Sequence, residues 1–363
     1  MSVGIHISKH SNIILKDDKH TKYKSYMEAI KNEVELLNMS AFAVFTIQPR
    51  SKAKISMDHQ SIKKYTEENN IKVYSHTSYI STGIWSVNFK NRPENKSLMY
   101  LRLIKDELVQ AKQLGALGVV LHVPRRTISE VLETMEILSN CKVINSIRRN
   151  PGILPKLTLE FPSSKPGTEL TYETPEKLNA FVKALKDDDK INLEWNLALD
   201  TAHLFAGGVS FKESNSWHEY VEALTPMTKS LIKLFHMNGA LGKNFGTGAD
   251  CHIIPFSKNQ DAIWGHLLSD EMHDFVERTS FEEINKINLY EKLSLDELKV
   301  LKNSSLYDIV KFAKKCDIAM IMEINRGDYN TAKCAMDIIN GLLKDAPSNG
   351  GSDISLQISE LKI

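Results

Sequence analysis

Short apolar runs rich in β-branched residues recur along the chain. Each run is six or seven residues long and lacks the strict alternation of a strand with one face in water, so the runs predict strands buried on both faces. There are eight of them, over residues 3–8, 41–47, 71–76, 118–123, 156–161, 195–201, 232–238 and 318–324. The hydrophobic pattern therefore predicts a sheet whose two faces are both covered.

The segments between these runs carry helical signatures. Residues 174–185 start with Thr174 as a candidate N-cap and Pro175 at the first helical position, followed by an apolar stripe at helical spacing. Residues 97–114 show a similar stripe and meet Gly115, a typical helix stop. Buried strands alternating with helices predict the α/β class and a (β/α)8 TIM barrel. A doubly wound parallel sheet is the alternative, because alternation does not show that the sheet closes.

The longest gap separates the seventh and eighth runs. Residues 256–302 contain two capping-box patterns, at 280–283 and 294–297, and so predict a helical insertion between strands 7 and 8. We expect residues 1–345 to form a single barrel domain. Residues 346–363 are small and polar, which is typical of a flexible C-terminal tail.

Composition narrows the class of protein. The chain has 363 residues, 42% hydrophobic and 25% charged, with a net charge of +1. It shows no apolar run of membrane-span length and no signal-peptide pattern, and its four cysteines lie far apart. We therefore expect a soluble intracellular protein of the cytoplasm or nucleus, not secreted and not bound to a membrane.

Side chains that commonly ligate metals stand at or just after the ends of the last six runs. They are His76, His122, Glu160, Asp200, His203, His236, Asp250, His252 and Glu323. Taken singly, a histidine there is more often a hydrogen-bonded core residue, and a carboxylate is more often a helix N-cap. In a barrel, however, all nine would meet at the mouth formed by the carboxyl ends of the strands, where so many charges require cations.

The donor types narrow the choice of metal. Imidazole and carboxylate without thiolate suit Zn²⁺, and also Mn²⁺ or another divalent transition metal in one site, but not Mg²⁺ or Ca²⁺. Nine ligands are too many for one ion, so we expect at least two ions and favour three. Clustered ions of this kind are typical of phosphoryl transfer.

The motifs that contain these residues resemble the endonuclease IV family of apurinic/apyrimidinic endonucleases. They are HTSYI (76–80), LHVP (121–124), LEFP (159–162), LDTAH (199–203), HMN (236–238), DCH (250–252) and MEIN (322–325). The resemblance implies a DNA-repair enzyme of base excision repair that hydrolyses the phosphodiester 5′ to an abasic site in double-stranded DNA. Its products would be a 3′-hydroxyl and a 5′-deoxyribose phosphate.

The resemblance also implies how the ligands are shared among three zinc ions. His76 and His122 would hold the first, with Glu160 bridging to the second. Asp200, His236 and Glu323 would complete the second, while His203, Asp250 and His252 would hold the third. Glu160, Asp200 and Glu323 are the expected catalytic residues.

The same resemblance suggests DNA contacts. Tyr79 matches a family tyrosine that contacts DNA, the alternative being a packing aromatic. Gln48, Arg50 and Lys52 lie on the loop after the second strand, which in the family enters the duplex, although a solvated surface role for Arg50 is an equal alternative. Further basic residues on strand-to-helix loops would suit phosphate contacts: Lys54, Arg125, Arg126, Lys165, Lys243 and Arg326.

We expect the protein to be a monomer. His6, in the first strand, is expected to support the site without binding metal.

Two other functions stay open. One is a metal-dependent sugar-phosphate isomerase or epimerase of the xylose-isomerase-like barrel group, which would not need a third ion. The other is a catalytically silent DNA-binding relative, which would be expected to lack a bridging ligand such as Glu160. Two segments also depart from the family pattern, at residues 9–23 and 256–302, and these could reshape the DNA groove.

Overall fold

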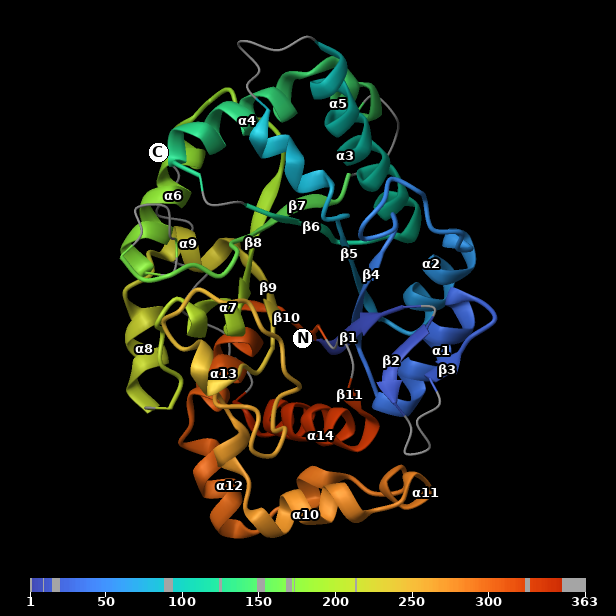
Figure 1. Cartoon of the computed structure of the whole chain (residues 1–363), viewed down its shortest axis with the longest axis vertical. Coiled ribbons are helices and arrows are strands. Elements are labelled where there is room, and N and C mark those ends of the chain that lie inside the picture. Colours follow the sequence, from blue (N-terminus) through green and yellow to red (C-terminus); the bar gives the residue numbers. More distant parts are fainter. Residues whose placement is uncertain are drawn as a thin grey trace.

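The computed structural model describes residues 2–8, 10–14, 20–87, 94–123, 126–148, 154–167, 172, 174–212, 214–323 and 327–347. Eight parallel strands close into a barrel in the order β1, β10, β9, β8, β7, β6, β5, β4, with β4 pairing back to β1. Helices form a ring around the strands (Figure 1). Closure confirms the predicted (β/α)8 barrel and excludes the doubly wound sheet.

Every predicted apolar run forms a barrel strand, and the ends agree within two residues. The strands are β1 (Val3–Ile7), β4 (Ala41–Phe45), β5 (Lys72–His76), β6 (Gly118–His122), β7 (Lys156–Glu160), β8 (Trp195–Asp200), β9 (Ile232–His236) and β10 (Ala319–Met322). One buried cluster fills the barrel interior and includes Tyr74, Val120, Leu234 and Ile321. A larger apolar cluster joins the strands to the helices. Both faces of the sheet are therefore covered, as the uninterrupted apolar runs predict.

Capping residues explain where helices of the ring begin and end. In α6 (Pro175–Asp187), the side chain of Thr174 accepts the backbone N–H of Lys177, as predicted for an N-cap. After α3 (Glu94–Leu114), Gly115 takes the left-handed conformation, with φ +73°. The other helices before β9 are α1 (Tyr26–Leu37), α2 (His59–Glu68), η1 (Ser81–Ser86), α4 (Ile128–Asn140), α5 (Lys142–Arg148), α7 (Thr201–Ala206), α8 (Ser214–Glu222) and α9 (Pro226–Leu231).

The long connection between β9 and β10 contains several short helices. It contains η2 (Gly242–Asn244), η3 (Gly265–Leu267), α10 (Asp270–Arg278), α11 (Phe281–Ile284), η4 (Leu289–Lys292), α12 (Leu295–Lys302) and α13 (Ser305–Cys316). Both predicted capping boxes form, at Ser280–Glu283 and Ser294–Glu297. Helices α10 and α11 pack on the outside of α14 (Tyr329–Asp345), away from the barrel strands (Figure 1).

A second, small sheet was not predicted. It consists of β2 (His10–Ile14), β3 (His20–Lys22) and β11 (Gly327–Asp328), in the order β11, β2, β3.

The predicted C-terminal tail lies outside the described residues, except for Ala346 and Pro347. Among the residues that the structure describes, no helix is long and apolar enough to cross a membrane.

Candidate metal centre

The barrel brings all nine predicted ligand residues together at the carboxyl ends of its strands. Donor atoms of eight of these residues form three overlapping groups, each compact enough to surround one ion, and Asp250 lies beside the third group. The groups are His76–His122–Glu160, Glu160–Asp200–His236–Glu323 and Asp200–His203–His252. The parallel register explains the convergence, because it aligns His122 with Glu160 and Asp200 with His236 on neighbouring strands.

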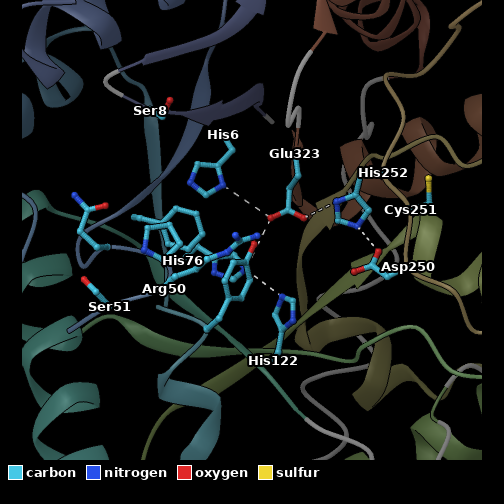
Figure 2. A pocket seen from close by; sticks show the side chains of 14 residues that line it. His6, Ser8, Arg50, Ser51, His76, His122, Asp250, Cys251, His252 and Glu323 are labelled. Atoms are coloured by element: carbon cyan, nitrogen blue, oxygen red, sulfur yellow. Dashed lines mark hydrogen bonds and ion pairs between the residues drawn. The ribbon is translucent and has the colours of Figure 1, made fainter. Parts of the chain in front are cut away.

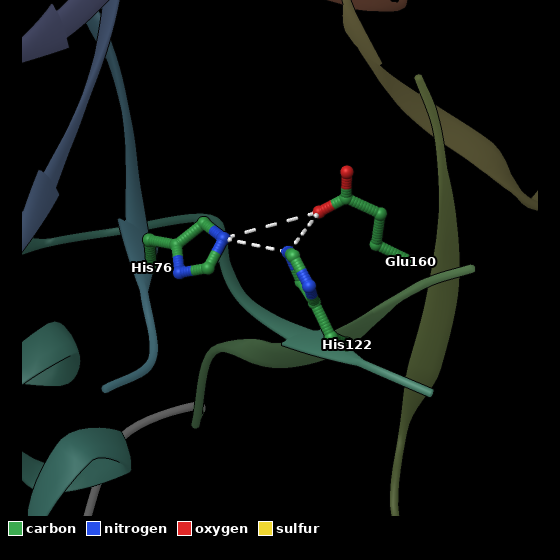
Figure 3. Close-up of side chains that lie close together, drawn as sticks. All are labelled: His76, His122 and Glu160. Atoms are coloured by element: carbon green, nitrogen blue, oxygen red, sulfur yellow. Dashed lines mark hydrogen bonds and ion pairs between the residues drawn. The ribbon is translucent and has the colours of Figure 1, made fainter. Parts of the chain in front are cut away.

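The first group joins the ends of β5, β6 and β7 (Figure 3). The Nε2 atoms of His76 and His122 lie 3.1 Å apart. The Oε2 atom of Glu160 lies 3.1 Å from His122 Nε2 and 3.9 Å from His76 Nε2. Three donor atoms thus surround one point.

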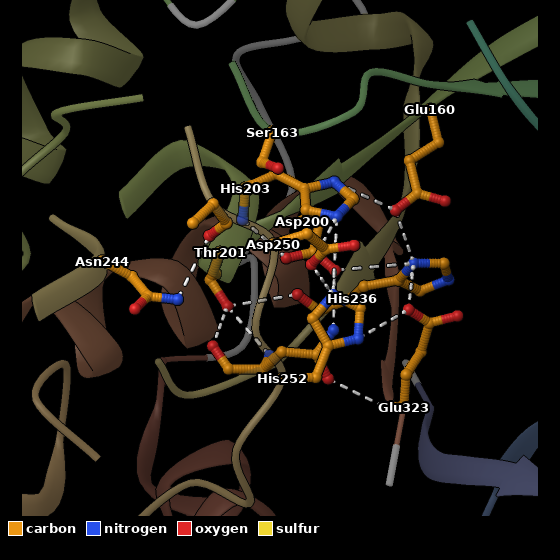
Figure 4. Close-up of polar contacts among 12 residues, drawn as sticks. Glu160, Ser163, Asp200, Thr201, His203, His236, Asn244, Asp250, His252 and Glu323 are labelled. Atoms are coloured by element: carbon orange, nitrogen blue, oxygen red, sulfur yellow. Dashed lines mark hydrogen bonds and ion pairs between the residues drawn. The ribbon is translucent and has the colours of Figure 1, made fainter. Parts of the chain in front are cut away.

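The second group shares Glu160 with the first (Figure 4). The other oxygen of Glu160, Oε1, lies 3.0 Å from His236 Nδ1. His236 Nδ1 also lies 3.5 Å from Glu323 Oε2 and 3.9 Å from Asp200 Oδ2. The two oxygens of one buried carboxylate therefore face two different ligand sets.

The third group lies on α7 and on the loop after β9 (Figure 4). His203 Nε2 and His252 Nε2 are 3.4 Å apart, and Asp250 Oδ1 lies 3.4 Å and 3.0 Å from them, respectively. Asp200 belongs to this group as well as to the second, and its Oδ2 lies 3.6 Å from His252 Nε2. Asp200 additionally caps α7, since its Oδ1 accepts the N–H of His203. The N-cap interpretation and the ligand interpretation of Asp200 are compatible, because they use different oxygens.

The donor set fits metal ions better than it fits hydrogen bonding. His76 Nδ1 faces the carbonyl oxygen of Thr77 at 2.8 Å, and His203 Nδ1 faces that of Phe161 at 2.8 Å. In a neutral ring, a proton on Nδ1 leaves Nε2 with a lone pair, and these lone pairs point at another histidine. Glu160 Oε2 is buried and makes no hydrogen bond within the described residues. A cation at each group would satisfy these atoms.

The carboxylates of the cluster favour protonation of the histidines that they face. Burial opposes charge on His236, but Glu160 and Glu323 outweigh burial and raise the pKa of His236 to about 10. Burial likewise opposes charge on His252, yet Asp200 and Asp250 raise its pKa to about 9. Burial and the neighbouring His122 lower the pKa of His76 to about 3. The carboxylates therefore draw cationic charge into this cavity, which is the environment that divalent ions would occupy.

Asn238 supports two of the candidate ligands, a role that the sequence alone did not reveal. Its side chain is 1% exposed. The Nδ2 atom donates to Asp200 Oδ2 at 2.6 Å, and the Oδ1 atom accepts the backbone N–H of Glu323 at 2.8 Å. The only signal in the sequence is its place in the HMN motif, two residues after His236.

A cavity of about 1070 Å³ opens over the candidate metal centre (Figure 2). Two of the predicted DNA contacts on the loop after β4, Gln48 and Arg50, line it together with Tyr79. Lys52 is not among its lining residues, and the ammonium of Lys52 lies 2.7 Å from Met99 Sδ. Of the other basic residues predicted at the mouth, Arg125 and Arg326 lie outside the described residues.

His6 also lines the cavity, on the wall formed by β1. Its Nδ1 lies 3.9 Å from Glu323 Oε1, and its ring packs 4.6 Å from the ring of Phe45. Its position beside a candidate ligand fits the supporting role expected from the sequence.

Comparison with known proteins agrees with this geometry. Residues 32–284 match the profile of the AP_endonuc_2 family, described as a xylose isomerase-like TIM barrel. Two relatives from African swine fever virus are named probable AP endonuclease. The relative from a Malawi tick isolate is 26% identical over 61% of this chain and 67% of its own length. The relative from the Pretoriuskop isolate is 24% identical over 74% of this chain and 86% of its own.

Solved structures show the same fold. A crystal structure named AsfvAP:AG has a TM-score of 0.68 at 21% identity, covering 95% of this chain and 98% of its own. Endonuclease IV from Thermus thermophilus has a TM-score of 0.57 at 19% identity, covering 95% and 100%. A D-tagatose 3-epimerase-like protein has a TM-score of 0.51 at 15% identity, covering 99% and 100%. The fold alone is therefore common to nucleases and sugar epimerases.

Proposed function

The chain belongs to the AP endonuclease family of xylose isomerase-like TIM barrels, and we propose that it is a zinc-dependent endonuclease of DNA repair. In this proposal it hydrolyses the phosphodiester 5′ to an abasic site in double-stranded DNA. The observation that carries the proposal is the convergence of nine ligand-type side chains at the barrel mouth, eight of them in three compact groups and Asp250 beside the third. The names of the viral relatives support the choice of substrate.

Each ion has its own residues in this proposal. His76 and His122 would hold the first ion, and Glu160 would be shared between the first and the second. Asp200, His236 and Glu323 would complete the second. His203, Asp250 and His252 would hold the third. The third group favours phosphodiester hydrolysis over sugar isomerisation, because a metal-dependent isomerase would not need a third ion, whereas clustered ions suit displacement at phosphorus.

When bound, the zinc ions supply Lewis acidity that neutralises charge on phosphate oxygens and activates water. The residues of the chain orient the substrate. Arg50 offers a cationic guanidinium to the phosphate from the cavity wall. Burial, together with Glu323 and Asp250, raises the pKa of Tyr79 to about 12. Tyr79 therefore keeps its proton at neutral pH and can donate a hydrogen bond to a phosphate oxygen.

The net reaction is the addition of water across one bond. The water oxygen bonds to phosphorus, and the bond between phosphorus and the 3′ oxygen of the preceding nucleotide breaks. The departing oxygen takes up a proton to give a 3′-hydroxyl, and the abasic sugar keeps the phosphate on its 5′ side.

The products provide the test. A duplex with one tetrahydrofuran abasic analogue, labelled at either end, should be cut once, directly 5′ to the analogue. A DNA polymerase should then extend the upstream fragment without further treatment, because it ends in a 3′-hydroxyl. A cut on the 3′ side, or a 3′-phosphate that blocks extension, would contradict the proposal. An intact duplex with zinc-loaded protein would also contradict it and would favour a sugar-phosphate substrate.

A further inference from the structure

Two loops at the barrel mouth carry the proposed DNA contacts. The first comprises residues 46–53 after β4, and the second comprises residues 77–82 after β5. We call them the paired loops. Gln48 and Arg50 line the cavity from the first loop, and Tyr79 lines it from the second. Tyr79 is 49% exposed, so its ring stands at the surface that a substrate would meet.

Ser78, on the second loop, is hydrogen-bonded to the first loop. Its side chain is 0% exposed. Its Oγ lies 3.0 Å from the carbonyl oxygen of Pro49 and 3.1 Å from that of Ser51, so one hydroxyl proton is shared between two carbonyls of the other loop. The neighbouring N–H of Tyr79 also donates to Pro49 O at 2.9 Å. Tyr79 and Arg50 are therefore held in register by contacts on the adjacent residues.

Glu107, on α3, accepts hydrogen bonds from the second of the paired loops. Its Oε1 accepts the backbone N–H of Ser78 at 2.8 Å and the hydroxyl of Ser81 at 3.0 Å. The residue is 0% exposed. Burial raises the pKa of Glu107 to about 8, so the carboxyl group is mostly neutral at pH 7 and its buried position carries little charge penalty.

Helix α3 also holds the first loop and its continuation toward α2. The ammonium of Lys54 lies 3.3 Å from Asp106 Oδ2, and that of Lys52 lies 2.7 Å from Met99 Sδ. One helix therefore contacts both loops, through Met99 and Asp106 on one side and through Glu107 on the other.

We propose that Glu107 and Ser78 are positioning residues that fix the paired loops to each other and to α3, so that Arg50 and Tyr79 meet the abasic nucleotide as one preformed surface. The inference rests on the proposed function for its substrate. Preorganisation of this kind strengthens binding because the loops need not be ordered when DNA arrives. Neither residue touches the metal centre, so loss of the coupling should weaken substrate binding and leave the chemical step intact.

Loop order can be measured without DNA. Amide hydrogen exchange should be slow in peptides covering 46–53 and 77–82 of the zinc-loaded protein. Ser78→Ala should speed exchange in the first loop, because it removes the shared hydroxyl. Glu107→Leu should speed exchange in both loops, whereas Glu107→Gln should not, because the amide oxygen of glutamine can still accept both hydrogen bonds. Ser305→Ala is the matched control, since Ser305 is also buried and donates to a backbone carbonyl, that of Phe211.

Kinetics at pH 7 supply the second readout. Ser78→Ala and Glu107→Leu should raise KM for the abasic duplex about 3- to 10-fold, with kcat and zinc content within about twofold of wild type. Glu107→Gln and Ser305→Ala should leave KM within about twofold. Unchanged exchange in both loops, or faster exchange with unchanged KM, would overturn the inference. If the wild-type protein fails to cut DNA, the proposed function fails, but the exchange result still decides whether the loops are coupled. Ser78→Ala keeps the test available if Glu107→Leu does not fold.

Discussion

Glu160 connects the first two ligand groups through its two oxygens. Oε2 lies 3.1 Å from His122 Nε2, and Oε1 lies 3.0 Å from His236 Nδ1. Burial would raise the pKa of this carboxyl group, but His236 and His122 outweigh burial and hold the pKa well below its usual range. Glu160 is thus an ionised carboxylate that faces both groups, as a bridging ligand must be.

Replacing Glu160 by glutamine therefore tests the bridge. Gln keeps the shape of the side chain but removes its charge, so the first two ions should be poorly held. Arg50 and Tyr79, which line the cavity, should be unaffected. Loss of a residue that merely orients a ligand typically costs 10–100-fold, so kcat should fall at least about 100-fold in Glu160→Gln. The Kd for the abasic duplex should change less than about threefold.

The matched control is Glu194→Gln. Glu194 precedes β8 at the opposite end of the barrel, where it pairs with Lys156 at 3.2 Å, and its substitution should leave kcat unchanged. An equal loss of kcat and of DNA affinity in Glu160→Gln would refute the bridging role.

Asn238 gives a second test at the residue scale. Asn238→Ala removes the donor to Asp200 Oδ2 and the acceptor for the Glu323 N–H. Loss of such an outer partner typically weakens metal binding by about 10–100-fold, and competition with a zinc chelator would measure the change. Asn330→Ala is the control, because Asn330 is equally buried but donates to the carbonyls of Val276 and Thr279 far from the centre. Equal zinc affinity in Asn238→Ala and wild type would contradict this supporting role.

At the scale of elements, the barrel strands were readable from the sequence because each is a short apolar run with helices on either side. The convergence of the candidate ligands could be predicted for a related reason, since parallel strands bring their carboxyl ends to one mouth. The sheet of β2, β3 and β11 could not be predicted, because its strands are five, three and two residues long and lack the longer apolar runs of the barrel strands. Asn238 and Glu107 were also not readable as supports, because their partners come from distant parts of the chain.

Glu297 links two helices of the long connection between β9 and β10. Its Oε2 accepts the N–H and hydroxyl of Ser294, the N-cap of α12. Its Oε1 accepts the N–H and hydroxyl of Ser269, the N-cap of α10. One carboxylate therefore stabilises the starts of both helices.

Glu297→Ala should lower the free energy of unfolding by about 2 kcal/mol, because two caps are weakened at about 1 kcal/mol each. Glu283→Ala is the comparison, since Glu283 accepts the N–H and the hydroxyl of Ser280 in the capping box of α11, and weakening that cap should cost about 1 kcal/mol. Urea denaturation measures both. Incision should be unaffected in either variant, and a loss of kcat in Glu297→Ala would assign α10 and α12 a part in the reaction.

Glu107 makes stability depend on pH in a defined direction. Burial raises its pKa to about 8, with Asp106 adding to the rise, while hydrogen bonds from Ser78 and Ser81 oppose it. Between the ordinary value of 4.5 and about 8, the folded protein binds this proton and the unfolded chain does not. The contribution of Glu107 to stability is therefore largest at low pH and declines as pH rises toward 8.

The predicted slope is up to about 1.4 kcal/mol per pH unit from this group. Glu107→Gln cannot ionise, so its stability relative to wild type should rise by at least about 1 kcal/mol between about pH 5.5 and about pH 7.5. Urea denaturation of the zinc-loaded proteins measures the difference. Glu67→Gln, which changes an exposed carboxylate, should follow the wild-type slope. A constant difference between Glu107→Gln and wild type would contradict the shifted titration.

At the scale of the whole molecule, one closed barrel supports the metal centre, the cavity and the paired loops. We propose that residues 1–345 act as a single domain and as a monomer. The net charge of +1 provides little long-range attraction to DNA, so binding would depend on basic residues close to the mouth, such as Arg50. The fold, the convergence of the candidate ligands and the loops that carry Gln48, Arg50 and Tyr79 could be predicted from the sequence. The contacts that hold these loops could not, because they depend on how the two loops and α3 pack.

Three zinc ions in this centre are proposed to cut DNA at abasic sites. The most direct measurement removes all metal, adds zinc in known steps, and follows metal content and incision of the tetrahydrofuran duplex on the same samples. We predict that incision 5′ to the analogue reaches its full rate only as zinc approaches about three ions per chain. Full activity at one ion per chain, or an intact duplex at three, would contradict the proposed trinuclear centre.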